Sequence, residues 1–508
     1  MKPARKAIPA EPPEALRARI EDFVRSCREP ALLEPGEKAI PLEAGRFDLE
    51  VHGSAVVLHA WGPESSLARR IVRIIRQEPE RSRLELAVTR LGSTEASVEI
   101  IDRARAGPSF ATRVGRLEFR ERFRRMLQRQ FGGWSIARIS AAADLQHSLS
   151  PAYTRALVTR GRQAFVAIGA DEAASASTCD HILTFGLIWL DHARAREPRR
   201  VVEGLKLFLP HGRGAVTARR LGFLDSSRAR FELHEFAPDG SVTAVEENNY
   251  GNLATTLDPV MPAPEPRPPV DQWIERLMTR FGAERVTRAD GLISLRLRGL
   301  EFARASSGVM TYGLDQDLPV GGSSFKRVEA LAEGIAAARS IDALDKQQWL
   351  YRKDPERWLE SVVRPRVRRL DGALIPDPLY SQVPAVAGVD RGIIDLLASD
   401  AAGRLAVLEL KASEDPHLPL QGLDYWMRVK WHLDRGEFSR RGYFPGVELR
   451  AAPPRLLLVS PALDFHPTTE TILRYFSPQV EVERIGLGAE WRRELKVAFR
   501  AYGAEKPG

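Results

Sequence analysis

The clearest pattern of apolar and polar residues lies near the C-terminal end of the chain. Two short apolar runs, 391–398 (RGIIDLLA) and 404–411 (RLAVLELK), flank the segment 399–403 (SDAAG). Runs of this length, separated by small and turn-forming residues, are typical of two antiparallel strands joined by a turn. The pattern therefore predicts a β-hairpin over 391–411.

The predicted hairpin brings three charged residues together. Facing residues in an antiparallel pair have a constant sum of numbers, and Asp395 and Glu409 are centred on position 402, inside the turn segment. Glu409 and Lys411 are two residues apart, so they project from the same face of their strand. The sequence thus predicts two carboxylates and an ammonium group side by side on otherwise apolar strands.

Two interpretations of these charges are open. They could lie on the wet face of an edge hairpin, with Lys411 paired to Glu409. However, Ile393, Leu397 and Val407 share their face, and the chain has only eleven lysines against sixty-four arginines. Paired carboxylates supply the oxygen ligands that Mg²⁺ prefers, and a neighbouring lysine can orient or activate an attacking water. The pattern favours a catalytic site.

The order of Asp395, a hairpin and then Glu409-Leu410-Lys411 resembles the motif of the PD-(D/E)XK nuclease superfamily, in particular its RecB-like branch. The resemblance covers about residues 346–508. It implies that Asp395, Glu409 and the backbone carbonyl of Leu410 hold Mg²⁺ or Mn²⁺. It also implies that Lys411 positions the attacking water or stabilises the charge that grows in the transition state.

The resemblance extends to two flanking helices. In the RecB-like branch a glutamine follows on the next helix, and 417–435 predicts such a helix with Gln421 and Tyr425 one turn apart. These two side chains would shape the site and contact the phosphodiester backbone. The family also has an upstream helical glutamate, and Glu360 in the predicted helix 354–364 fits that place, where it would assist a metal through water. A proline five residues after Glu360 departs from the pattern, because it ends or kinks the helix.

The implied fold of this part is the αβββαβ core of restriction-endonuclease type, within an α/β chain whose earlier domains are α+β. The expected elements are a helix (354–364), three strands (378–384, 392–398, 404–412), a helix (417–435), a strand (454–459), a helix (467–476), a strand (479–485) and a helix (490–501).

The remainder divides at a segment with six prolines, 258–270 (DPVMPAPEPRPPV), which predicts an extended linker. We expect a small α+β domain at 1–115, an α+β domain with a basic helix at 116–257, and an α+β connecting unit at 271–345, before the nuclease-like domain at 346–508. The patterns predict helices over 12–30, 66–76 and 117–131, and strands over 156–169, 202–209, 217–223 and 230–236. A faint internal similarity relates 160–187 to 298–314.

The predicted helix 117–131 has an apolar stripe, and arginines cover the rest of its surface. Between positions 103 and 138 ten arginines stand against two glutamates. The helix could contact phosphates, or its arginines could simply be a solvated face.

Several polar clusters are expected to be structural. Asp144, His147, Cys179, His181 and His192 lack the spacing of metal ligands, and no strained turn marks a serine nucleophile near them.

Composition describes an ordinary globular protein, with 44% hydrophobic and 28% charged residues. A net charge of +8 permits nucleic acid binding without requiring it. Two distant cysteines exclude a disulfide scaffold, and no run of 18 apolar residues predicts a membrane span. We expect a cytoplasmic protein.

The sequence therefore predicts a metal-dependent nuclease, most plausibly an endonuclease acting on DNA, with recognition domains before it. Two alternatives are a nucleic-acid-binding module that has kept the nuclease fold without cutting, and an interaction protein whose charged residues form a surface cluster.

Overall fold

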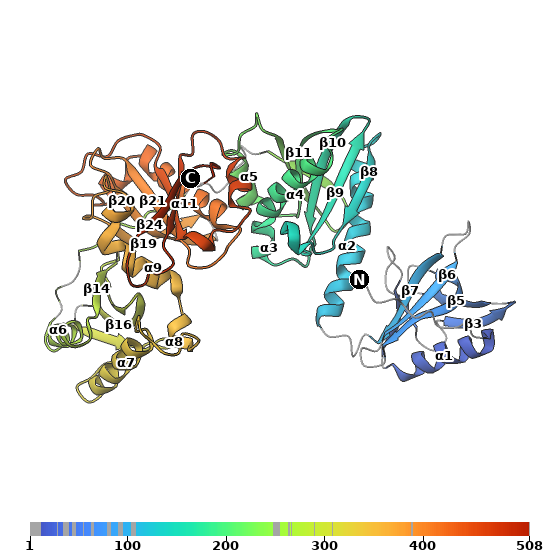
Figure 1. Cartoon of the computed structure of the whole chain (residues 1–508), viewed down its shortest axis with the longest axis horizontal. Coiled ribbons are helices and arrows are strands. Elements are labelled where there is room, and N and C mark those ends of the chain that lie inside the picture. The colour runs from blue at the N-terminus through green and yellow to red at the C-terminus, as the bar shows by residue number, and fades with distance from the viewer. Residues whose placement is uncertain are drawn as a thin grey trace.

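The computed structural model describes residues 12–27, 29–33, 40–42, 47–53, 55–61, 66–78, 83–89, 95–102, 108–246, 255–262, 265, 267–288, 290–306, 308–387 and 390–506. In the part of the chain that the structure describes, four β-sheets with packed helices make a mixed α/β protein, and each sheet lies within one of the four ranges predicted as domains. Figure 1 shows the N-terminal sheet standing apart from the other three. Among the described residues, no helix is long and apolar enough to cross a membrane.

The N-terminal unit packs helix α1 on an antiparallel sheet with the order β2-β1-β7-β6-β5-β4-β3. The predicted helix over 12–30 is α1. The predicted helix over 66–76 is wrong, because this segment is strand β5. Two irregularities in its pairing with β6 shift the alternation, so that Ile71 and Ile74 both face the core at a spacing that mimics a helix. The bounds are α1 (Pro13–Ser26), β1 (Pro30–Leu33), β2 (Ile40–Pro41), β3 (Phe47–His52), β4 (Ala55–Trp61), β5 (Ser66–Glu78), β6 (Arg83–Thr89) and β7 (Glu95–Asp102).

The second unit begins with α2, which crosses the predicted boundary at 115/116. Its sheet has the order β13-β12-β11-β10-β9-β8, with α2 on one face and α4 on the other. Phe119, Phe123 and Leu127 of α2 are buried against the sheet, as the apolar stripe predicted. The bounds are α2 (Pro108–Gln130), β8 (Ser135–Ser140), β9 (Tyr153–Arg160), β10 (Gln163–Ala170), α3 (Ala176–Asp180), α4 (Ile182–Arg196), β11 (Val201–Pro210), α5 (Ala215–Leu221), β12 (Arg230–Phe236) and β13 (Val242–Val245).

Two predicted strands of this unit need correction. The segment 156–169 is not one strand but the β9–β10 hairpin, which turns at positions 161 and 162. The predicted strand 217–223 is wrong, because residues 217–221 belong to helix α5, and all five of them are buried, so burial there does not alternate as in a half-exposed strand.

The third unit packs α6 and α7 on a five-stranded antiparallel sheet with the order β14-β15-β16-β17-β18. The proline-rich segment before it has no helix or strand in its described residues up to 269. Part of this segment lies on the C-terminal unit, since the Val260 amide donates to the Arg441 carbonyl at 2.8 Å. The bounds are α6 (Val270–Phe281), β14 (Glu284–Thr287), β15 (Ile293–Leu297), β16 (Leu300–Ser306), β17 (Val309–Tyr312), β18 (Leu318–Pro319) and α7 (Phe325–Ala338).

The C-terminal unit has a six-stranded sheet with the order β19-β20-β21-β22-β23-β24, between α11 on one face and α9 on the other. β21, β22 and β23 are parallel, and the outer pairs are antiparallel. The bounds are α8 (Trp349–Arg352), α9 (Pro355–Val363), α10 (Val367–Leu370), β19 (Tyr380–Ala387), β20 (Asp390–Ser399), β21 (Leu405–Leu410), α11 (Leu418–Asp434), α12 (Glu437–Arg440), β22 (Arg455–Pro461), α13 (Thr469–Leu473), β23 (Val482–Leu487) and β24 (Val497–Tyr502).

The helix predicted over 490–501 is wrong. Its last five residues belong to β24, which pairs with β23 and closes the sheet edge, and the residues before them form turns and irregular structure. Phe499 packs so tightly over Gly486 that a β-carbon there would lie 2.2 Å from its ring. This contact across the sheet decides the local structure, which spacing alone had assigned to a helix.

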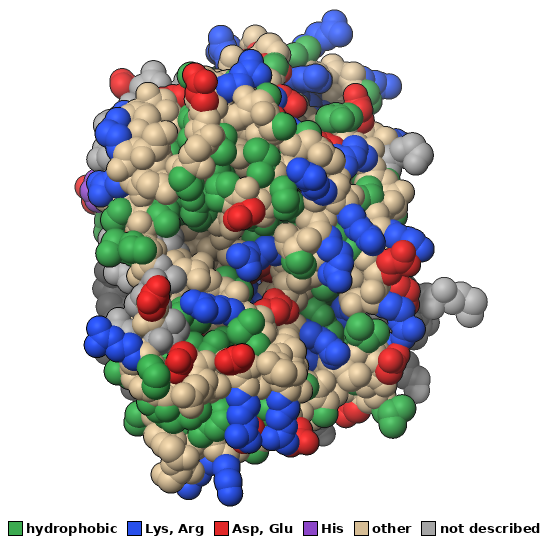
Figure 2. Space-filling view, turned by 90° about the vertical axis from the view of Figure 1, so that its left-hand side faces the viewer, with side chains coloured by type: hydrophobic (Ala, Val, Ile, Leu, Met, Phe, Trp, Pro, Cys, Tyr) green, Lys and Arg blue, Asp and Glu red, His purple; other side chains and the backbone are tan. Residues whose placement is uncertain are grey.

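A tight contact holds the third unit against helix α9. In the turn between β15 and β16, Gly299 has φ +78°, and a β-carbon on it would lie 1.8 Å from the carbonyl oxygen of Arg357. Arg357 is on α9, and Figure 2 shows the molecule from the side where these two units lie, with a hollow between them. Only glycine allows this approach of one backbone to the other.

We therefore expect Gly299→Ala to lower the free energy of unfolding by about 1–3 kcal/mol, because a side chain is strained at this φ and collides with α9. The matched control is Gly334→Ala on the exposed face of α7, where nothing lies within 4 Å of the added carbon. It should leave stability unchanged or raise it by up to about 1 kcal/mol. Urea unfolding followed by tryptophan fluorescence checks both, and equal midpoints for the two variants would contradict the contact.

Candidate active site

The register of the β20–β21 hairpin agrees with the predicted one. The observed pairs Leu396↔Leu408 and Leu397↔Val407 have the sum that also relates Asp395 to Glu409. The backbone amide of Leu410 donates to Oδ2 of Asp395 at 3.0 Å, so this carboxylate reaches across to the neighbouring strand. The two carboxylates therefore lie side by side where the hairpin ends.

The two carboxylates are removed from water to different degrees. Glu409 is 1% exposed, and its Oε2 atom has no hydrogen-bond partner. Burial raises the pKa of Glu409 well above its ordinary value, and the neighbouring Asp395 raises it further. Burial also raises the pKa of Asp395 to about 6, although the hydrogen bond from Leu410 acts in the opposite direction. The fold thus holds two carboxyl groups in surroundings where ionising them costs free energy.

Lys411 follows directly on β21. Its Nζ lies 3.3 Å from Oδ2 of Asp415, four residues later, whereas the surface interpretation required an ion pair with Glu409. Burial alone would lower the pKa of Lys411, but the carboxylates of Asp415 and Glu409 outweigh it and raise the pKa. The lysine is therefore a charged ammonium group. The sequence interpretation missed Asp415, for which the spacing of four residues was the only signal.

Gln421 and Tyr425 lie together on α11, one turn apart as predicted. Nε2 of Gln421 donates to the hydroxyl of Tyr425 at 3.3 Å. Burial, and then the charge of Glu409, raise the pKa of Tyr425, which keeps its proton. The carboxylate of Glu409 therefore interacts electrostatically with the Tyr425 hydroxyl.

Glu360 is on α9, and both of its oxygens are already engaged. Arg296 of β15 donates to Oε1 at 3.1 Å, while Arg357 and Gln382 donate to Oε2 at 2.9 and 3.1 Å. Nη1 of Arg357 also lies 3.9 Å from Oδ1 of Asp395. Arg357 thus connects the glutamate to the hairpin, and Glu360 anchors the third unit to the site.

The sequence interpretation missed these partners of Glu360. Arg357 had a signal, since it stands three residues before Glu360 on one helix. Arg296 had none, because it comes from another unit.

Five arginines lie close to the site in the sequence, at positions 364, 366, 368, 369 and 391, and the structure places their side chains differently. Arg366 and Arg369 line a cavity of about 450 Å³ between the third and C-terminal units, together with Arg298, Arg492 and Arg493. The guanidinium of Arg368 donates to the Leu374 carbonyl, and Arg364 is half-buried. The side chain of Arg391 lies outside the described part of the chain.

The side chains of the site offer a hard divalent cation only a few protein ligands. Within the described residues, no group of three or more histidine, cysteine, aspartate or glutamate side chains could hold a metal ion. Mg²⁺, however, keeps several waters and is commonly held by one or two carboxylates plus substrate phosphates. The unpartnered Oε2 of Glu409, next to Asp395, fits this arrangement.

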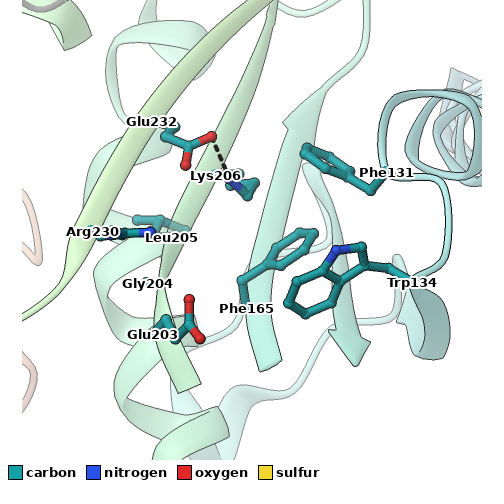
Figure 3. Close-up of a pocket in the computed structure, with 9 residues that line it drawn as sticks. All are labelled: Phe131, Trp134, Phe165, Glu203, Gly204, Leu205, Lys206, Arg230 and Glu232. Atoms are coloured by element: carbon teal, nitrogen blue, oxygen red, sulfur yellow. Dashed lines mark ion pairs between the residues drawn. The ribbon is translucent and has the colours of Figure 1, made fainter. Parts of the chain in front are cut away.

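A second pocket, of about 150 Å³, lies on the sheet of the second unit beyond the end of α2. Figure 3 shows the ammonium group of Lys206 beside the rings of Phe131 and Phe165 and paired with Glu232. The chain's own cation thus lines the pocket and already pairs with a carboxylate there.

Because Glu409 is buried, we expect its substitution to change the stability of the protein in opposite directions with and without metal. Without divalent cation, Glu409→Gln should be more stable than the wild type, because it removes a buried charge beside Asp395. With Mg²⁺ at about 100 times its dissociation constant, the wild type should gain about 2.7 kcal/mol, and the variant much less. Thermal unfolding over a Mg²⁺ titration, in chelator-treated buffer, measures both effects.

The matched control is Glu414→Gln, which removes an exposed carboxylate five residues away. It should respond to Mg²⁺ like the wild type. A wild type that Mn²⁺ and Mg²⁺ leave unchanged would rule out the metal site.

Comparison of the sequence with models of known protein families gives no match, and comparison with curated proteins gives none either.

Proposed function

We propose that residues 346–508 form a metal-dependent nuclease of the PD-(D/E)XK type, similar to the RecB-like branch, which hydrolyses phosphodiester bonds in DNA. One observation carries the proposal. The carboxylate of Glu409 is buried with an unpartnered oxygen, beside Asp395 on the facing strand and in the electrostatic field of Lys411.

This observation calls for a function because the arrangement is unfavourable for folding. A buried polar atom without a partner costs about 1–3 kcal/mol, and more when it is charged. Two adjacent carboxyl groups with raised pKa values add mutual repulsion. Perturbed carboxyl groups of this kind gather at sites where a cation or a reacting group binds.

The order of elements supports the proposed type of fold. Helix α9, the antiparallel strands β19, β20 and β21, helix α11 and the parallel strand β22 follow the αβββαβ order.

The proposed reaction transfers the phosphoryl group of a DNA strand to water. Bound Mg²⁺ or Mn²⁺ would lower the pKa of the attacking water and would neutralise negative charge on the phosphate. Asp395, Glu409 and the carbonyl of Leu410 would hold the ion. The water loses a proton to solvent as its oxygen forms a bond to phosphorus. The bond from phosphorus to one sugar oxygen breaks, and that oxygen takes up a proton from solvent.

The remaining side chains stabilise and orient. The Lys411 ammonium, held by Asp415, would orient the water and stabilise the charge on the phosphate oxygens. The amide of Gln421 and the hydroxyl of Tyr425 would contact the phosphodiester backbone at the edge of the site. The arginines that line the cavity between the third and C-terminal units would attract the nucleic acid.

The position of Arg357 favours a second candidate function. Its guanidinium lies 3.9 Å from Asp395 and partly neutralises the negative charge of that carboxylate, as a metal ion would. This position suits a nucleic-acid-binding or protein-interaction module on a nuclease fold that no longer cuts. The two candidates differ in their need for divalent cation.

Lys411→Met tests the proposed function. It removes the ammonium group and keeps a long apolar stem, so we expect cleavage to slow by roughly 100-fold or more while the Mg²⁺-dependent rise in stability remains. Asp395→Asn should abolish both cleavage and that rise. Cleavage of labelled duplex and single-stranded DNA in Mg²⁺, Mn²⁺ and chelator gives the rates.

Lys430→Met is the control, since Lys430 is on α11 of the same unit but pairs with Asp434. It should cut at the wild-type rate. DNA binding without metal-dependent cutting of any form would favour the non-cutting module.

A further inference from the structure

The second unit repeats the architecture of the C-terminal unit. In both, a helix precedes three antiparallel strands, and then a helix, a parallel strand, a helix, a second parallel strand and an antiparallel edge strand follow. The sheets β8–β13 and β19–β24 share one strand order. The sense of pairing is the same at each step from β8/β9 to β12/β13 and from β19/β20 to β23/β24.

The strand registers relate residues of the two units. The parallel ladders β11/β12 and β22/β23 both end at a proline, Pro210 in one and Pro461 in the other. Counting back along the strands makes Leu207 equivalent to Leu458. These two residues pair with Ile168 and Glu409 on the preceding strands.

The helices over the sheets support this correspondence. His181 and Gly186 on one side, and His417 and Gly422 on the other, are both five residues apart. A β-carbon on either glycine would lie 2.8 Å from a leucine methyl of the central strand below it, so both helices approach their sheets equally closely. The repeat therefore joins 116–257 with 346–508. The similarity between 160–187 and 298–314 is not this repeat, since the first includes α4 and the second only strands.

The three catalytic positions of the C-terminal unit carry different residues in the second unit. Ile168 stands where Glu409 is, and two residues later Ala170 stands where Lys411 is. Arg155, which pairs with Ile168, stands where Asp395 is. This arginine is 3% exposed and donates to the Ser150 carbonyl at 2.6 Å, so it is part of the local structure. The second unit thus lacks the carboxylates and the lysine.

The two units pack against each other about a pseudo-two-fold axis, because equivalent residues meet. The rings of His181 and His417 stack with centroids 3.5 Å apart. Leu224 and Phe476 form a β-bridge. Around it the contacts are reciprocal: the Asp225 amide donates to the Tyr475 carbonyl, and the Ser477 amide donates to the Phe223 carbonyl, both at 2.8 Å.

Ion pairs join the corresponding elements on both sides, although the residues that form them are not equivalent. Arg220 of α5 donates to both oxygens of Asp424 on α11, at 2.9 and 2.7 Å. On the other side Arg474, directly after α13, lies 3.1 Å from Asp191 on α4. One apolar cluster includes residues from both units, so they are fixed together like the halves of a dimer.

We infer that one chain is an internal pseudo-dimer of two nuclease-like cores, of which only the C-terminal core cuts, and that its substrate is duplex DNA of which it nicks one strand. The inference rests on the proposed function of the C-terminal site. The strands of a duplex are related by two-fold axes, as the two cores are, whereas a single strand offers no such symmetry. The strand that faces Arg155, Ile168 and Ala170 is held and left intact.

The test uses the full-length protein and supercoiled plasmid in excess, with Mg²⁺, at a concentration where light scattering shows a monomer. We expect nicked circles as the first product, with linear DNA only after nicked circles have accumulated. In a duplex oligonucleotide with both strands labelled, each cutting event should leave the other strand whole. Asp395→Asn should yield no product, and its circular dichroism should equal that of the wild type.

The outcomes distinguish failure of the inference from failure of the proposed function. Linear plasmid that appears without a preceding nicked form, or single strands cut faster than duplex, would overturn the inference while the proposed function stands. No metal-dependent cleavage of any nucleic acid would overturn the proposed function. Nicking that Asp395→Asn retains would place the chemistry outside the C-terminal core and overturn both.

Discussion

The antiparallel register of β20 and β21 is the constraint on which the candidate site depends. Because Leu396 pairs with Leu408, Asp395 and Glu409 must lie together, and a slip of one residue would place the two carboxylates on opposite faces of the sheet. The buried leucines and valines of the hairpin fix this register. The apolar core thus supplies the free energy that holds two unfavourable carboxyl groups in place, next to a lysine whose charge Asp415 maintains.

Glu360 shows how one residue can connect domain packing to the site. Its oxygens accept hydrogen bonds from Arg296 of the third unit and from Arg357 and Gln382 of the C-terminal unit. The backbone contact at Gly299 brings the third unit close enough for this. The third unit therefore helps to position Arg357, and Arg357 in turn changes the electrostatic environment of Asp395.

The packing of the second unit on the C-terminal unit gives the long chain a simple organisation. Two cores of one topology meet through α4, α5, α11 and α13, and the stacked pair His181 and His417 lies at the centre. Burial lowers the pKa of both histidines, so they are neutral when they stack. His181, which the sequence indicated to be structural, therefore lies with His417 in the interface between the two cores.

The sequence by itself determined the hairpin, its register and the neighbouring helix with Gln421 and Tyr425, because alternation and helical spacing are local properties. It failed where distant contacts decided the outcome. Bulges that β6 imposes on β5 imitated helical spacing, and β23 made a strand of a segment assigned to a helix. The hydrogen-bond partners of Glu360 appear only in the tertiary structure, because Arg296 comes from another unit. The repeat also appears only there, because the two units share strand order and packing but carry different side chains, such as Arg155 and Ile168, at the corresponding site positions.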